Sequence, residues 1–361
     1  MAENNFTVIE NSSVYYQGHY WNDYEQVRQE INKRTSGDVH VNWHLHFKNT
    51  HPNRKFKKAL FVNCGNGWVE RDIYKTGLFE EAVGVDYLQP LIDDAQHQAN
   101  ISNLPFRYYQ LDINTGIFPE KDFDLVVNHA GFHHVAFINK VLKAVCEVMT
   151  PDGYFVNYDY VGPHRNQYPY EQWSEVFLLN ESLPSEVRQA LMYPHQPTML
   201  VTDPTEAIHS ELIIEATARY FNLVEHKKVG GGLAYPLLTF NNNMRVASQE
   251  LQNEWIRFIL KEDLRFLQDH PHLSLFDYFV GTPNKEIIRD WEKMAHFDQI
   301  EQKREKESSL SNGVYYPNTL LQDLYLKIAN LGSNNDHLRA ELDSFYSRSK
   351  RFLMKLYKGL P

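Results

Sequence analysis

The sequence predicts an α/β protein built on a doubly wound, mostly parallel sheet of seven strands. From residue 58 to residue 162, short apolar runs alternate with helical stretches, a rhythm that joins parallel strands through crossover helices. Two further apolar runs, separated by a long helical stretch, complete the sheet with an antiparallel pair. The predicted strands are 59–62, 82–85, 106–109, 123–127, 153–156, 221–229 and 275–280.

Helical patterns and composition divide the chain into three parts. Helices are predicted at 21–33, at 136–148, where the apolar positions have helical spacing, and at 253–268. Residues 163–220 are rich in Pro and Tyr and predict a mostly helical insertion. We therefore predict an N-terminal helical and aromatic cap (1–57), a central domain (58–283) with a lid insertion (164–220), and a charged linker and tail (284–361).

Composition excludes several classes of protein. The 361 residues carry a formal charge of -10, which disfavours nucleic acid as a partner. Two cysteines, far apart in the sequence, cannot form a disulfide framework. The N-terminus has neither the basic run nor the apolar core of a secretory signal, and no stretch reaches the roughly twenty apolar residues of a membrane-spanning helix. We therefore expect a cytoplasmic protein.

The tail predicts contacts outside the central domain. Its apolar residues from Leu321 to Phe345 recur at intervals of three, four or seven, the pattern of short coiled coils, which predicts a homo-oligomer. The last turns carry Arg348, Lys350 and further basic residues beside apolar ones. Such an end favours peripheral contact with an anionic membrane surface. Docking of this helix on the protein's own acidic domain is an equally good interpretation.

Three predicted loops carry residues that suit a nucleoside ligand. The first strand is followed by Asn63-Cys64-Gly65-Asn66-Gly67 and then by a helix, whose unpaired N–H groups favour an anionic group. Asp86 ends the second strand, where a ribose diol would lie in dinucleotide-binding folds, and Asp112 follows the third. Because the carboxyl ends of these strands meet in one crevice, we expect one binding site there.

These residues resemble the motifs of the class I S-adenosylmethionine-dependent methyltransferases, a Rossmann-like family, over about residues 58–161. The resemblance implies S-adenosyl-L-methionine as the cofactor. It implies that the glycine loop holds the methionine part, that Asp86 binds both ribose hydroxyls, and that Asp112 and Ile113 contact the adenine. The implied cofactor-binding residues are Asn63, Cys64, Gly65, Gly67, Asp86, Asp112, Ile113 and Asn128.

One departure from this family leaves a second reading open. The family usually has an acidic residue shortly before its first glycine, where this chain has Phe61 and Asn63. A catalytically silent scaffold that assembles a complex through its tail therefore stays an alternative. A nicotinamide enzyme fits less well, because no third glycine follows Gly67. Methylation of bases fits less well too, because the fourth strand lacks the Asn/Asp-Pro-Pro-aromatic motif.

Histidines near this crevice are candidates for a general base. His133 and His134 follow the fourth strand and His164 follows the fifth; an imidazole titrates near neutrality, so each can take a proton from a hydroxyl. Tyr158 and Asp159 are candidates for orienting such a histidine. The aromatic residues of the insertion suit either a packed lid or a platform for sugar rings; they are Tyr168, Tyr170, Trp173, Tyr193 and His195.

We predict no metal site. His40, His44 and His46 lie close together, but no acidic or cysteine partner has ligand spacing, so a half-buried aromatic segment with alternating character is favoured. The sequence as a whole predicts an S-adenosylmethionine-dependent O-methyltransferase with a histidine base. Its acceptor is expected to be a small polar molecule, with a sugar or glycan terminus favoured because the resemblance is nearest to methyltransferase groups found beside surface-glycan pathways.

Overall fold

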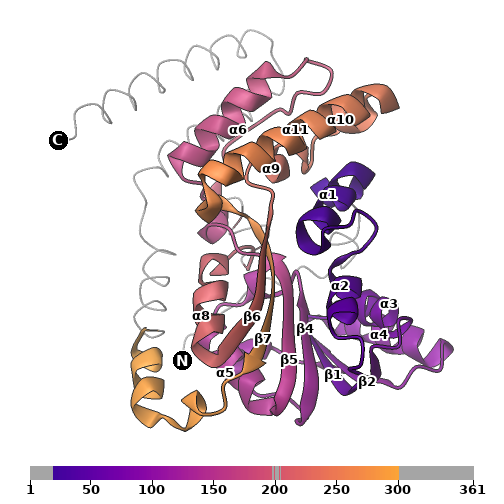
Figure 1. Cartoon of the computed structure of the whole chain (residues 1–361), viewed down its shortest axis with the longest axis vertical. Coiled ribbons are helices and arrows are strands. Elements are labelled where there is room, and N and C mark those ends of the chain that lie inside the picture. Colours follow the sequence, from indigo (N-terminus) through magenta and orange to yellow (C-terminus); the bar gives the residue numbers. More distant parts are fainter. Residues whose placement is uncertain (1–18, 197–198, 200–202, 204, 301–361) are drawn as a thin grey trace.

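The computed structural model describes residues 19–196, 199, 203 and 205–300, and its centre is a seven-stranded sheet (Figure 1). The strand order is β3-β2-β1-β4-β5-β7-β6. Strands β1 to β5 pair in parallel, and β7 runs antiparallel to both of its neighbours. The predicted fold class and its antiparallel pair are thus confirmed. The strands are β1 (Phe56–Val62), β2 (Phe79–Asp86), β3 (Phe106–Gln110), β4 (Phe123–His129), β5 (Met149–Tyr160), β6 (Phe221–Gly230) and β7 (Phe276–Pro283).

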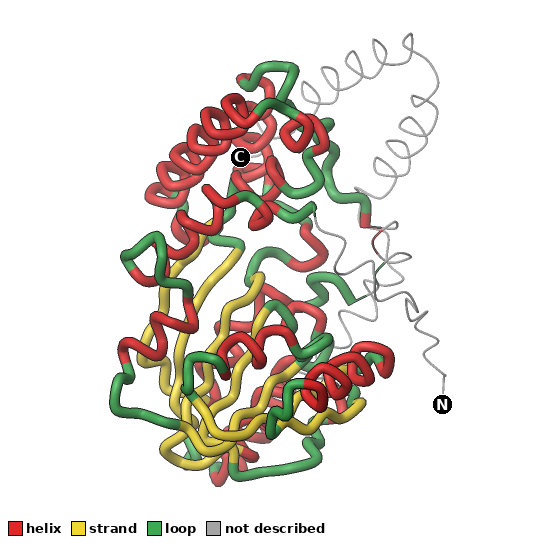
Figure 2. The backbone as a smooth tube through the Cα atoms, turned by 90° about the vertical axis from the view of Figure 1, so that its right-hand side faces the viewer, coloured by secondary structure: helices red, strands yellow, loops and turns green. Residues whose placement is uncertain are grey.

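Helices cover both faces of the sheet and its upper end (Figures 1 and 2). Helices α1 to α4 pack on one face, α5 and α8 pack on the other, and α6, α9, α10 and α11 form a layer at one end. The helices are α1 (Glu25–Ser36), α2 (Trp43–Thr50), α3 (Trp68–Tyr74), α4 (Gln89–Ile101), α5 (Ile138–Val148), α6 (Tyr170–Ser182), α8 (Ile213–Tyr220), α9 (Ala234–Leu238), α10 (Asn242–Val246) and α11 (Gln249–Asp269).

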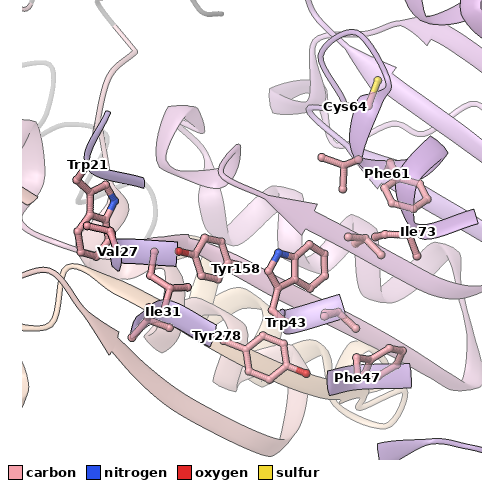
Figure 3. Packing of buried hydrophobic residues seen from close by; sticks show 14 of the residues in the cluster. Trp21, Val27, Ile31, Trp43, Phe47, Phe61, Cys64, Ile73, Tyr158 and Tyr278 are labelled. Atoms are coloured by element: carbon pink, nitrogen blue, oxygen red, sulfur yellow. The ribbon is translucent and has the colours of Figure 1, made fainter. Parts of the chain in front are cut away.

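The central strands are buried on both faces, which explains their continuous apolar runs. In β1, Leu60 packs in the core under α5 and α8, while its neighbour Phe61 packs in the core under α1 to α4. Figure 3 shows Phe61, Ile73 and Cys64 together on the face covered by α1 to α4. A rigid sheet buried in this way fixes where the strand ends, and therefore the loops of the site, lie.

The N-terminal helix is fastened to the end layer by a buried ion pair. The Arg34 guanidinium on α1 donates to Asp263 on α11 at 2.6 Å and to Glu30 at 2.8 Å. Asp263 is fully buried and also accepts the backbone N–H groups of Leu233 and Ala234. Helix α1, which lies in the predicted cap, is therefore fixed against α11.

Replacement of Arg34 by Met is expected to lower the free energy of unfolding by about 3 kcal/mol, because the Asp263 carboxylate would stay buried without its cation. Urea unfolding monitored by circular dichroism measures this change. The matched double variant Arg34→Met with Asp263→Asn removes both charges but keeps an acceptor oxygen for the buried N–H groups of Leu233 and Ala234, so it should recover part of the loss. Equal stability of Arg34→Met and the wild type would show that the pair contributes nothing.

Two segments differ from the sequence-based expectations. An alternating pattern was expected over residues 41–47, but the helix α2 begins at Trp43. Asn42 is its N-cap, and the Asn42 side-chain oxygen accepts the Leu45 N–H at 3.0 Å. Helix α8 lies inside the predicted lid range but packs against α5 in the core of the sheet. The three-part division of the chain stays a prediction.

The charged linker begins within the described residues and the coiled-coil and basic tail lies outside them. Met294 is 7% exposed and packs on the α5 and α8 face, where the Phe297 ring lies 5.7 Å from that of Tyr220. The core therefore continues past Pro283. Among the described residues, none of the helices combines the length and the apolar character that crossing a membrane requires.

Candidate active site

The loop between β1 and α3 turns through three residues in left-handed backbone conformations. Asn63, Gly65 and Gly67 have φ of 50°, 57° and 75°. Gly67 is required for a second reason, since a Cβ there would lie 2.5 Å from the Tyr108 hydroxyl oxygen. The loop ends at Trp68, the first residue of α3, and the helix start has no side-chain cap hydrogen bond within the described part of the chain.

Asp86, at the end of β2, lies against this loop. Its two carboxylate oxygens accept the backbone N–H groups of Gly65 at 2.8 Å and Leu88 at 3.0 Å. Burial raises the pKa of the Asp86 carboxyl. Each oxygen accepts one such bond and keeps a further lone pair, so the carboxylate can also accept hydroxyl groups of a ribose.

The end of β3 lies beside Asp86, as predicted for one shared crevice. The Leu111 N–H donates to the Asp86 carbonyl at 2.8 Å. Asp112 is exposed, and its side chain accepts the Asn114 N–H at 3.0 Å. The Ile113 side chain is 3% exposed and packs in the core, so a ligand would reach its backbone.

The loops after β1 and β4 are joined by side-chain hydrogen bonds. The Asn63 amide donates to the Gly131 carbonyl at 2.6 Å. Asn128 is fully buried and donates to both Asn157 and Asp159 at 2.6 Å, while its oxygen has no hydrogen-bond partner within the described part of the chain. Burial raises the pKa of the Cys64 thiol well above its usual range, so this residue is no nucleophile.

The residues present fit an adenosyl cofactor. A glycine loop leading to a helix start, the Asp86 carboxylate with spare lone pairs, and the adjacent end of β3 form one crevice at the carboxyl ends of the strands. Asn128 lies below the β4 loop, with an unsatisfied oxygen. Their individual roles in binding stay predictions.

A buried carboxylate–imidazole pair follows β4 and β5. The Nδ1 of His133 lies 2.6 Å from the Asp159 Oδ1. Asp159 is fully buried, and its second oxygen accepts the Phe132 and Gly131 N–H groups at 2.7 and 3.2 Å. Burial alone would lower the pKa of His133, but the charge and hydrogen bond of Asp159, together with the charges of Glu206 and Asp203, outweigh it and raise this pKa to about 9.

His134 and Glu206 complete this group, which we call the imidazole cluster (His133, His134, Asp159 and Glu206). The Nδ1 of His134 lies 3.1 Å from the Thr205 hydroxyl, and burial lowers the pKa of this imidazole. The Nε2 atoms of His133 and His134 lie 3.8 and 3.9 Å from one oxygen of Glu206. Glu206 was absent from the predicted site, because about 70 residues separate it from the two histidines.

His164 lies in a different group from the other two candidate bases. Its Nδ1 contacts the Ile208 carbonyl, and its ring lies 5.6 Å from that of His209. His164, His209 and Glu211 have donor atoms within 4.8 Å of one another, as do His133, His134 and Glu206, so each trio could hold a metal ion. The absence of a metal site stays a prediction.

Tyr158 does not orient His133. Its ring instead stacks on His129 at 5.5 Å and on Trp43 at 6.3 Å. Asp159 alone of the two orienting candidates contacts His133. The two side chains point to opposite faces of β5, which explains why only one of them reaches the histidine.

The aromatic residues of the insertion pack mainly on one another. Tyr168 stacks on Trp173 at 5.7 Å, Tyr193 meets Trp173 edge-on at 5.1 Å, and the Tyr193 hydroxyl donates to the Tyr168 carbonyl at 2.9 Å. Only Tyr170 is largely exposed among the four tyrosine and tryptophan rings predicted here. This arrangement fits the packed-lid interpretation better than an open platform for sugars.

The buried Glu70 on α3 should make the stability of the folded protein depend on pH. Its carboxyl is fully buried, and burial raises its pKa from 4.5 to about 7. Between these values the unfolded chain loses the proton while the folded protein keeps it, so stability falls as the pH rises, by roughly 3 kcal/mol in all. Glu70→Gln mimics the protonated form. It should raise the melting temperature at pH 8 and leave it nearly unchanged at pH 4.5; no difference at pH 8 would contradict this.

The part of the chain that forms this crevice matches a known protein family. Residues 60–157 match the family model described as "Methyltransferase domain". The matched range runs from β1 through most of β5 and contains the glycine loop, Asp86, Asp112 and His133. This match supports S-adenosylmethionine as the cofactor and a methyltransferase as the class of enzyme.

Curated relatives match the same part of the chain. An uncharacterized methyltransferase of Mycobacterium tuberculosis is 30% identical over 105 residues, 29% of this chain and 51% of that protein. A fatty-acid O-methyltransferase of Mycolicibacterium smegmatis is 30% identical over 32% of this chain and 40% of its own length. The mitochondrial arginine-hydroxylase NDUFAF5 of Rattus norvegicus is 30% identical over 28% and 29%. The chain thus spans about half the length of the mycobacterial methyltransferase and less of the other two.

Solved structures are similar at lower identity. A protein of Pyrococcus horikoshii is 16% identical with a TM-score of 0.38, over 66% of this chain and 86% of that chain. Geranyl diphosphate C-methyltransferase of Streptomyces coelicolor is 10% identical with a TM-score of 0.42, over 66% and 74%. The strand order and the family match agree: residues 60–157 match a methyltransferase domain, and the sheet has the fold of the class I S-adenosylmethionine-dependent enzymes.

Proposed function

We propose that this protein is an S-adenosylmethionine-dependent O-methyltransferase that acts on a small polar acceptor. The observation that carries the proposal is the position of the imidazole cluster. His133 follows the same strand as the buried Asn128, and the Asn63 amide of the glycine loop donates to the carbonyl of Gly131, two residues before His133, at 2.6 Å. The imidazole cluster therefore adjoins the candidate cofactor crevice, which supports a histidine base.

The residues support proton removal from an acceptor hydroxyl. When bound, the cofactor supplies an electrophilic methyl group on its sulfonium. Asp159 holds the Nδ1 of His133, which leaves Nε2 as the atom that would take the proton of an acceptor hydroxyl at the cofactor's methyl group. The remaining task of the protein is to align oxygen, carbon and sulfur.

A sugar or glycan terminus is the favoured acceptor. A hydroxyl acceptor agrees with the imidazole base, and one relative carries O-methylation in its name, although that name refers to a fatty acid. The alternative, a catalytically silent scaffold, is supported by Asn63, since an acidic residue usually occupies this position in the family. The Asn63 amide donates to the Gly131 carbonyl. Nucleic acid stays disfavoured by the charge of -10.

The test is methyl transfer by the full-length protein. Incubation with S-adenosylmethionine and a panel of sugars and glycans should release S-adenosylhomocysteine and yield a product heavier by one methylene. The variant Asp86→Ala is the negative control. Binding of the cofactor with no transfer to any hydroxyl compound would favour the scaffold.

The tail proposal concerns partners and location. We propose that residues beyond 300 form a homo-oligomer and touch a membrane surface from the cytoplasm. Because Met294 and Phe297 pack on the core, truncation belongs after residue 300 rather than after Pro283. The truncated protein should sediment as a monomer, bind cofactor and fail to pellet with anionic vesicles. An unchanged oligomer would refute the role of the tail.

A further inference from the structure

Two neighbouring hollows lie along α1, and the first of them borders the candidate cofactor crevice. The first, the ring pocket, has a volume of about 460 Å³ and lies between α1, α2, α3 and the ends of β4 and β5. Its wall includes Trp68, which directly follows Gly67, and His129, which directly follows Asn128. The ring pocket therefore begins where the predicted cofactor residues end.

Aromatic rings form the wall of the ring pocket. Trp43, His129 and Tyr158 are stacked, with Trp43 and Tyr158 each 5.5 Å from His129 and inclined to it by 18° and 20°. Figure 3 shows Trp43 beside Tyr158 in this stack. Trp68 meets His129 edge-on, and 49% of its surface is exposed. Flat rings of this kind pack against the apolar face of a ring-shaped ligand.

The ring pocket suits an uncharged group. Burial lowers the pKa of His129 to about 4, so this imidazole is neutral near pH 7. The Arg28 guanidinium, the cation of the lining, is bound to the carbonyls of Asn22 and Asp23 at 3.0 and 2.6 Å. The remaining charges of the lining are the carboxylates of Glu25 and Asp72, which disfavour an anion here.

The second hollow, the cation pocket, has the opposite character. Its volume is about 320 Å³, it lies between α1 and α11, and it shares Gln29 and Val39 with the ring pocket. Lys33, Arg257 and Lys261 line it, and none of these three forms an ion pair with a carboxylate of the described residues. The acidic residue of this lining, Glu30, is bound to Arg34 at 2.8 Å.

Three unpaired cations around one hollow are a marked feature in a chain with a net charge of -10. Lys and Arg side chains recognise phosphate oxygens, the Arg fork bidentately. We propose that the two pockets together bind a phosphorylated sugar, with the sugar ring on the exposed Trp68 of the ring-pocket wall and the phosphate on Lys33, Arg257 and Lys261. Its use as the methyl acceptor rests on the proposed function; its binding does not.

Two kinds of ligand would carry such a phosphate group beside a sugar ring: a sugar monophosphate and a nucleoside diphosphate sugar. The experiment uses full-length protein saturated with S-adenosylhomocysteine and four probes: glucose, inorganic phosphate, glucose 1-phosphate and UDP-glucose. Calorimetry or ligand-observed NMR measures each Kd at low ionic strength. We expect one or both of the phosphorylated sugars to bind at least tenfold more tightly than glucose, and preference for UDP-glucose would identify the nucleotide-linked source.

Matched variants separate the two pockets. Lys33→Ala with Lys261→Ala should weaken the phosphorylated probe about tenfold at low salt and less at high salt, because exposed charges are screened. Trp68→Ala should weaken the binding of glucose 1-phosphate but leave the Kd of inorganic phosphate unchanged. Lys121→Ala, an exposed lysine before the amino end of β4, is the control and should change nothing.

Two results would overturn this inference. One is that neither phosphorylated sugar binds more tightly than glucose; the other is that the double lysine variant binds them as the wild type does. The wild-type titration with S-adenosylhomocysteine, measured first, reports on the proposed function separately. If S-adenosylhomocysteine binds but neither phosphorylated sugar does, only the two-pocket site is rejected.

Discussion

His133→Gln is expected to lower kcat by roughly 10²- to 10⁴-fold, the usual contribution of a general base. Glutamine keeps a polar group of similar reach but cannot take up a proton, so the affinity for S-adenosylhomocysteine should stay within about twofold. The matched control is His97→Gln, an exposed histidine on α4, which should leave kcat unchanged. Equal activity of His133→Gln and the wild type would remove His133 from the mechanism.

The pH profile adds a signature that a structural role would not give. A base with a pKa of about 9 is mostly protonated at pH 7, so kcat/KM should rise with pH up to about 9. Asp159→Asn removes the charge that raises this pKa, so its profile should reach its plateau at lower pH and at a lower rate. A flat profile between pH 7 and 9 in the wild type would contradict the assignment.

The same raised pKa affects folding. A histidine whose folded-state pKa lies above its usual value stabilises the folded state fully below about pH 6.5, and that contribution is lost as the pH rises through 9. His133→Gln should therefore flatten the stability profile in this interval. The loss at Glu70 has the same sign, since its carboxyl pKa is also raised, and it is complete by about pH 8, so the two losses add up as the pH rises.

Asp86→Ala is expected to raise the Kd for S-adenosylhomocysteine by about 10- to 150-fold. Hydrogen bonds to a charged group contribute about 1.5–3 kcal/mol, and that range corresponds to this change in Kd. Calorimetric titration measures it. Since Asp86 also accepts the N–H groups of Gly65 and Leu88, thermal unfolding must show that the variant is folded.

Two comparisons make the Asp86 result specific. Asp93→Ala removes an exposed carboxylate from α4 and should leave the affinity unchanged. Asp86→Asn keeps the size of the side chain and one acceptor oxygen, so its Kd should fall between those of the wild type and Asp86→Ala. Unaltered binding by folded Asp86→Ala would place the ribose elsewhere.

Much of the sheet could be predicted from the sequence, because buried parallel strands are continuous apolar runs. The same reasoning failed at residues 41–47, where an apparent alternation was overridden by the Asn42 cap and the packing of Trp43 and Phe47 as one helical face. Asp86 and the end of β3 were found because strand ends meet at one edge of a sheet.

The rest of the site depended on contacts between distant segments. The sequence offered His133, His134 and His164 as equal candidates, and only the fold shows that a buried Asp159 holds the first while a carbonyl holds the third. Glu206 and the two pockets of α1 are formed by residues with no local signal. Such residues become visible only when the lid and the N-terminal helices are placed against the sheet.

The most direct test of the account is a crystal structure of the full-length protein with S-adenosylhomocysteine. We predict that the ribose lies on Asp86, that the adenine lies at the end of β3, and that the sulfur faces the Nε2 of His133. A cofactor bound away from the glycine loop, or with its sulfur directed away from the imidazole cluster, would contradict the proposed mechanism.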